Sequence, residues 1–126
     1  MTLTPAFYLN VSWGLRILLA VIFFAAGAAK IAAIPMMVQL FAQIGLGQWF
    51  RFVTAGVEIA GAVALLIPGL TGLGAAWLGT TMFFAVVAHL FVLRSNPGGA
   101  IVLLVLSSSL AWLMREQLVM LRERLL

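Results

Sequence analysis

The chain has 126 residues, of which 65% are hydrophobic and only 8% are charged, and its mean hydropathy is +1.23. A soluble domain has about 25% charged residues, so this chain has too little charge to cover a water-facing surface. The net charge of +4 comes from scattered Lys and Arg side chains, and nucleic-acid binding is not expected. Because there is no cysteine, disulfides, thiol redox chemistry and thiolate metal sites are excluded. We expect one all-α integral membrane domain.

Four apolar stretches predict four transmembrane helices. They cover about residues 13–33, 50–67, 73–93 and 100–114. Thr4-Pro5 is typical of a helix start, and Ile34-Pro35 ends the first helix. Pro68-Gly69 stops the second helix, and the turn at residues 94–99 separates the third from the fourth.

The remaining segments are too short or too polar to span. Met36–Trp49 has only glutamines as polar residues and contains Gly45 and Gly47, so we predict a short interfacial or partly re-entrant helix. Residues 115–126 form a charged amphipathic tail that we expect to leave the membrane along its surface. The expected fold is therefore a four-transmembrane-helix bundle with an interfacial segment between its first two helices.

Four spans place both termini on one side of the membrane. Arg16, Arg115, Arg122 and Arg124 then lie on that side, and Lys30, Arg51 and Arg94 lie on the other. The positive-inside rule favours cytoplasmic termini by this count, while dual topology stays open.

Glu58 is the most informative polar residue of the chain. It lies within a residue or so of the centre of the second predicted span. At about 1.5 Å per residue this position is almost at the bilayer midplane, and a glutamate stem is too short to reach water from there. The carboxyl group must therefore be protonated, paired or facing a polar cavity.

Three other polar residues lie within the predicted spans. Arg16 is near the start of the first span, where its long stem can reach the interface, which favours a structural role. Lys30 lies in the last turn of the same helix and His89 lies near the end of the third span. One histidine and one carboxylate are too few to predict a metal site.

Lys30 and His89 belong to the same end of the predicted bundle. Both lie about 10 Å from the midplane, and helix Cα–Cβ bonds tilt them inward while Glu58 tilts toward them. We therefore predict an intramembrane polar cluster of Lys30, Glu58 and His89, with Arg16 as a secondary polar residue.

The sequence resembles the DoxX-like family. The similarity is carried by Arg16-Ile-Leu-Leu-Ala with Phe24, Gly27 and Lys30, by Gly45, by Gly56-Val-Glu58-Ile-Ala-Gly61 with Leu65-Leu66 and Pro68, and by Met82-Phe-Phe-Ala85 with His89-Leu90. It covers about residues 14–115. The resemblance implies a compact four-helix bundle in a bacterial-type cytoplasmic membrane and a site at Arg16, Lys30, Glu58 and His89.

The resemblance leaves the activity open, because relatives include subunits of thiosulfate:quinone oxidoreductases, components of oxidative-stress complexes and membrane assembly chaperones. One hypothesis is an accessory subunit of a membrane redox complex, with a quinone bound in the bundle and electrons from a partner protein. A second is a binding or assembly protein. A third is a small proton-coupled transporter acting as a dimer. Rows of small residues such as Gly56, Ala60 and Ala64 fit either internal packing or a homo-oligomer face.

Overall fold

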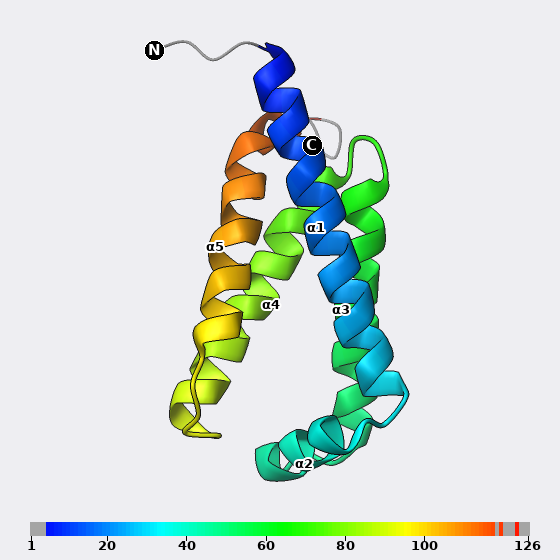
Figure 1. The fold of residues 1–126 in the computed structure, drawn as a ribbon, viewed down its shortest axis with the longest axis vertical. Coiled ribbons are helices and arrows are strands. Elements are labelled where there is room, and N and C mark those ends of the chain that lie inside the picture. The colour runs from blue at the N-terminus through cyan, green and yellow to red at the C-terminus, as the bar shows by residue number, and fades with distance from the viewer. Residues whose placement is uncertain (1–4, 118, 120–122, 124–126) are drawn as a thin grey trace.

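The computed structural model describes residues 5–117, 119 and 123, and this part of the chain is helical, with no strand (Figure 1). The helices are α1 (Pro5–Ile31), α2 (Pro35–Ile44), α3 (Trp49–Leu66), α4 (Thr71–Phe91) and α5 (Gly98–Leu113). The expected all-helical fold is confirmed. The predicted helix cap at Thr4 and much of the predicted tail at 115–126 lie outside the described residues.

Three of the helices are long and apolar enough to cross a membrane. They cover Leu9–Ile31, Trp49–Leu66 and Thr71–Phe91, where the sequence predicts its first three spans. The fourth predicted span corresponds to α5, an apolar helix of 16 residues. A helix that crosses a bilayer has about 17–25 residues, so α5 is slightly shorter than this range.

Prolines stand at the starts of α1 and α2, and residues with left-handed backbone conformation follow their ends. Pro5 occupies the start of α1, where its missing N–H costs no hydrogen bond. After α1 the chain turns through Ala33, whose φ is 57°, and Pro35 begins α2. Gly45 ends α2 with a φ of 84°, a conformation that glycine adopts without strain. The predicted interfacial segment is thus α2 with its glycine exit, and α2 lies across one end of the bundle (Figure 1).

The bundle is closed at one end and open at the other. Helix α3 packs against α1 and α4, and α5 packs mainly against α4. Figure 1 shows that α4 and α5 diverge from α1 and α3 toward the end where α2 lies. The buried core consists of Leu19, Ala20, Phe23, Ala62, Leu65, Ala75, Leu78, Met82 and Leu110.

Glycines bring the helices of the closed half into backbone contact. A Cβ atom on Gly74 of α4 would lie 2.9 Å from Ala64 Cβ, 3.0 Å from the Leu65 amide nitrogen and 3.1 Å from the Gly61 carbonyl oxygen. All three atoms belong to α3, and two of them are backbone atoms that no side-chain rotation can move. The α3–α4 distance therefore depends on the absence of a side chain at Gly74.

We expect Gly74→Ala to separate α3 from α4 and to lower the free energy of unfolding by about 1–3 kcal/mol, as overpacking does elsewhere. The measurement is thermal unfolding of the purified protein in a mild detergent. Gly56→Ala is the matched control, because a Cβ at Gly56 meets nothing within 4 Å. Equal melting temperatures for the two variants would contradict the backbone-contact argument.

Candidate functional site

Lys30 and Glu58 form an ion pair between α1 and α3. Lys30 Nζ lies 2.9 Å from Glu58 Oε1, and the two side chains are only 11% and 4% exposed. One turn before Lys30, Gly27 allows the close approach of α3, since a Cβ there would lie 2.6 Å from Ile59 Cγ1. The structure thus brings two of the three predicted cluster residues into direct contact, and both are shielded from solvent.

Arg51 holds the same end of the bundle together, whereas the sequence indicated only that its charge lies on one side of the membrane. Its guanidinium Nη1 donates a hydrogen bond to the Lys30 carbonyl oxygen at the end of α1, and its Nε donates to Gln48 Oε1 at 3.0 Å. Gln48 Nε2 in turn donates to the Val38 carbonyl oxygen of α2 at 3.0 Å. Arg51 therefore joins α1, α2 and α3, and it gives the Lys30 carbonyl oxygen a second donor beside the Ala33 N–H.

One signal for this role was present in the sequence. A cation in the first turn of a helix is electrostatically unfavourable, because that end of the helix carries partial positive charge. Arg51 lies in the first turn of α3, so its position predicts a hydrogen-bond partner that offsets this unfavourable interaction. Gln48, three residues earlier, has the helical spacing to supply one.

A cavity of about 540 Å³ opens beside the ion pair, in the half of the bundle where the helices diverge. Its walls come from all five helices and are mostly apolar, with several aromatic and methionine side chains. These include Phe23, Met37, Phe41, Phe50, Met82 and Phe84. Val53 and Phe84 also line the cavity, and they are 46% and 64% exposed, so the cavity reaches the outer surface of the bundle.

His89 lines this cavity from α4 but does not contact the ion pair. Its Nδ1 lies 2.7 Å from Ser95 Oγ, in the connection between α4 and α5. Within the described part of the chain, no hydrogen bond or ion pair links His89 to Lys30 or Glu58. His89 therefore lines the same cavity as the ion pair and is a separate polar group on the cavity wall.

Arg16 lies toward the opposite, closed end of the bundle, away from the cavity. Its Nε donates a hydrogen bond to Ser12 Oγ at 3.0 Å, and its Nη2 lies 3.6 Å from Met114 Sδ. The guanidinium carbon is 4.5 Å from the centroid of the Trp13 ring. We expected the long Arg16 side chain to reach the membrane interface, but Arg16 is only 8% exposed. Its partners hold the guanidinium group between α1 and the end of α5.

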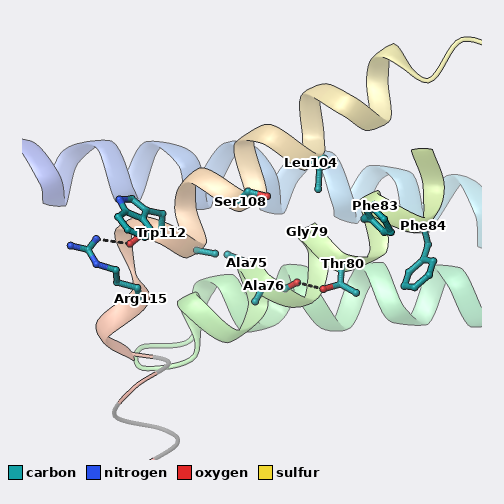
Figure 2. A pocket seen from close by; sticks show the side chains of 11 residues that line it. Ala75, Ala76, Gly79, Thr80, Phe83, Phe84, Leu104, Ser108, Trp112 and Arg115 are labelled. Carbon is teal, nitrogen blue, oxygen red and sulfur yellow. Dashed lines mark hydrogen bonds between the residues drawn. The ribbon is translucent and has the colours of Figure 1, made fainter. Parts of the chain in front are cut away.

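A second hollow runs along the outer surface of α4 and α5 (Figure 2). It has a volume of about 670 Å³ and is lined both by small residues, such as Ala75 and Gly79, and by the aromatic residues Phe83, Phe84 and Trp112. Thr80 Oγ1 donates to the Ala76 carbonyl oxygen, and Arg115 donates to the Trp112 carbonyl oxygen. This groove has no ion pair or charged group buried inside it, unlike the cavity at Lys30 and Glu58. The latter is the candidate functional site.

The described residues include no group of three His, Asp or Glu side chains that could hold a metal ion. The titratable groups that line the cavity are one ammonium group, one carboxyl group and one imidazole among the described residues. Such a site can bind a lipophilic molecule and orient its polar end by hydrogen bonds.

The sequence profile of the DoxX-like family matches residues 14–114, which is most of the chain. This protein is a membrane protein of helical architecture and belongs to the DoxX-like family. The match includes all of Arg16, Lys30, Glu58 and His89. No curated protein and no solved structure matched the chain.

Because Lys30 and Glu58 are paired and largely buried, we expect Lys30→Met and Glu58→Leu each to lower the free energy of unfolding by about 1–3 kcal/mol, by leaving a buried partner unpaired. The double variant Lys30→Met/Glu58→Leu should lose less than the sum of the two single losses. Denaturant or thermal unfolding in detergent measures the coupling. Additive losses would contradict a direct ion pair.

Proposed function

We propose that this protein binds a lipid-soluble quinone in the cavity beside Lys30 and Glu58, as an accessory subunit of a quinone-linked redox complex in a bacterial-type cytoplasmic membrane. The observation that carries the proposal is the combination of an apolar cavity with a shielded Lys–Glu ion pair on its wall. A quinone has the matching parts, which are a flat apolar ring, a polar oxygen on the ring and an apolar tail.

The size and lining of the cavity support a ligand of this kind. Binding cavities for small molecules have volumes of about 300–1,000 Å³, with a few polar groups in a mostly apolar wall. The cavity here has about 540 Å³, and aromatic side chains from four helices border it, among them Phe23, Phe41, Phe50 and Phe84. Its opening beside Val53 and Phe84 leaves a path by which an apolar tail could extend into lipid.

The ammonium group supports recognition of a ring oxygen. Lys30 Nζ has three hydrogens, and Glu58 Oε1 is its one hydrogen-bond acceptor among the described residues. The other hydrogens are available to a carbonyl oxygen of the ring, and His89 offers a second polar contact from α4. Hydrogen bonds from a charged donor are about twice as strong as neutral ones.

Electron transfer would depend on a partner protein. The chain has no cysteine and a single histidine, so it lacks the ligands for an iron–sulfur cluster or a bis-histidine haem. In this proposal the DoxX-like chain holds and orients the quinone, and an electron-donating subunit supplies the redox centre.

We further propose that α5 is the fourth span and that both termini are cytoplasmic. Arg16, Lys30 and Arg51 are held inside the bundle, so they do not act as loop charges. The count that remains is Arg94 on one side against Arg115 and the later Arg122 and Arg124 of the sequence on the other. This three-to-one ratio favours cytoplasmic termini more than the count over all seven cations does.

Topology is testable by single-cysteine labelling, since the natural chain has no cysteine. In intact cells, a membrane-impermeant maleimide should label an Asn96→Cys variant, and it should label a Glu116→Cys variant only after permeabilisation. Labelling of both from the same side would show that α5 does not cross. The reverse pattern would show that the orientation is inverted.

Quinone binding is testable with decylubiquinone and the purified protein in detergent. A ligand that binds only the folded state raises the melting temperature, and the rise grows with the logarithm of the ligand concentration once this exceeds the dissociation constant. We expect such a rise for the wild-type protein and a smaller rise in Ala88→Phe, because Ala88 lines the cavity and a phenyl ring there would take up space that the ligand needs.

Val87→Phe is the matched control, because Val87 is the adjacent residue of α4, is 36% exposed and does not line the cavity. It should keep the wild-type response. A rise of equal size in Ala88→Phe and Val87→Phe would place the ligand elsewhere, and no rise in the wild-type protein would contradict the proposed function.

A further inference from the structure

The ion pair leaves one carboxylate oxygen of Glu58 without a partner. Oε1 accepts from Lys30 Nζ at 2.9 Å, whereas Oε2 is buried and has no hydrogen bond to any described residue. The Glu58 side chain is 4% exposed, and the residue lines the cavity. A buried acceptor that is left unpaired costs free energy, and native proteins rarely keep one without a reason.

The other polar side chains around the cavity do not supply a donor to this oxygen. Thr54 Oγ1 donates to the Phe50 carbonyl oxygen of its own helix at 2.9 Å. Thr81 Oγ1 does the same with the Trp77 carbonyl oxygen, also at 2.9 Å. His89 is engaged with Ser95. Among the described residues no side chain donates to Glu58 Oε2, so this oxygen is free to accept from a molecule inside the cavity.

The ion pair therefore offers a ligand both a hydrogen-bond donor and a hydrogen-bond acceptor. Lys30 Nζ has unused hydrogens to donate, and Glu58 Oε2 has lone pairs to accept. A hydroxyl group matches both, because it donates one hydrogen and accepts at the same oxygen. A carbonyl or an ether oxygen matches only the lysine, since it has no hydrogen to give to the carboxylate.

We infer that the cavity selects ligands by a ring hydroxyl group, so that it binds the reduced quinol form of its ligand in preference to the oxidised quinone. This inference rests on the proposed function, because it assumes that the cavity takes a lipophilic ring compound. It specifies that the preferred ligand is the reduced form. Glu58 distinguishes quinol from quinone, and Lys30 holds the Glu58 carboxylate in place.

The first test uses two ligands that differ by one hydrogen-bond donor and cannot be reduced or oxidised under the assay conditions. They are 4-heptylphenol and its methyl ether, 4-heptylanisole. For the wild-type protein in detergent we expect the phenol to bind about 10- to 100-fold more tightly, the range for a hydrogen bond to a charged group. The measurement is the dissociation constant from isothermal titration or from ligand-dependent melting.

Glu58→Gln separates this preference from general hydrophobic binding. The amide keeps one acceptor for Lys30 and replaces the second oxygen by an NH₂ group, which donates to an ether or a carbonyl. The preference for the phenol should fall below about twofold in this variant, because the lost discrimination is that of one hydrogen bond. Glu116→Gln is the matched control, because Glu116 is exposed and lies outside the cavity, and it should keep the wild-type preference.

A second measurement needs no variant. Tighter binding of the reduced form raises the reduction potential of the bound two-electron couple, by about 30 mV for each tenfold preference. Redox titration of decylubiquinone with the wild-type protein should therefore show a bound fraction at higher potential than the free fraction. The proposal thus stays testable if Glu58→Gln does not fold.

The outcomes distinguish this inference from the proposed function. Equal binding of the phenol and the ether, or an unshifted potential of bound decylubiquinone, would overturn the hydroxyl selectivity and leave quinone binding in place. Binding of neither ligand, together with no response to decylubiquinone, would overturn both. If Glu58→Gln still prefers the phenol to the ether, a group other than the Glu58 carboxylate recognises the hydroxyl.

Discussion

A carboxyl group near the middle of a membrane-spanning helix requires a partner, and in this protein much of the structure at the open end is arranged to supply one. Lys30 reaches Glu58 because Gly27 lets α1 and α3 approach one turn away. Arg51 then fixes the end of α1 through the Lys30 carbonyl oxygen and, through Gln48, fixes α2. The ammonium and carboxyl groups can remain shielded together because each compensates part of the cost of removing the other from water.

The two ends of the bundle are stabilised by different physical means. At the closed end, Gly74 lets α4 meet the backbone of α3, Gly61 makes room for the Leu78 side chain, and the core side chains fill the space between the helices. At the open end the helices diverge, and hydrogen bonds and an ion pair replace the missing apolar packing. The cavity exists because the contacts that hold this end together are polar and peripheral, so the centre need not be filled.

This arrangement explains how a chain with so few charged residues can contain a chemically specific site. An ammonium or carboxylate group in an apolar environment interacts more strongly with a ligand than it would in water, because less solvent screens it. For the ligand that we propose, the unused donors of Lys30 and the unpaired oxygen of Glu58 would require a complementary polar head. In that proposal the aromatic walls select for size and hydrophobicity, and the two charged side chains supply the specificity.

Much of the fold and part of the site could be predicted from the sequence alone. Apolar runs, prolines and glycines determine the helices, because their effects act within a few residues, and depth alone marks Glu58 as a residue in need of a partner. The sequence also predicted Lys30 and His89 as partners of Glu58. Only the tertiary structure decided that Lys30 makes the contact while His89 bonds to Ser95, and that Arg16 and Arg51 are buried and link helices. These contacts depend on how the helices are rotated and spaced. Glycine contacts between segments far apart in the sequence set that rotation and spacing, and a local sequence pattern does not reveal them.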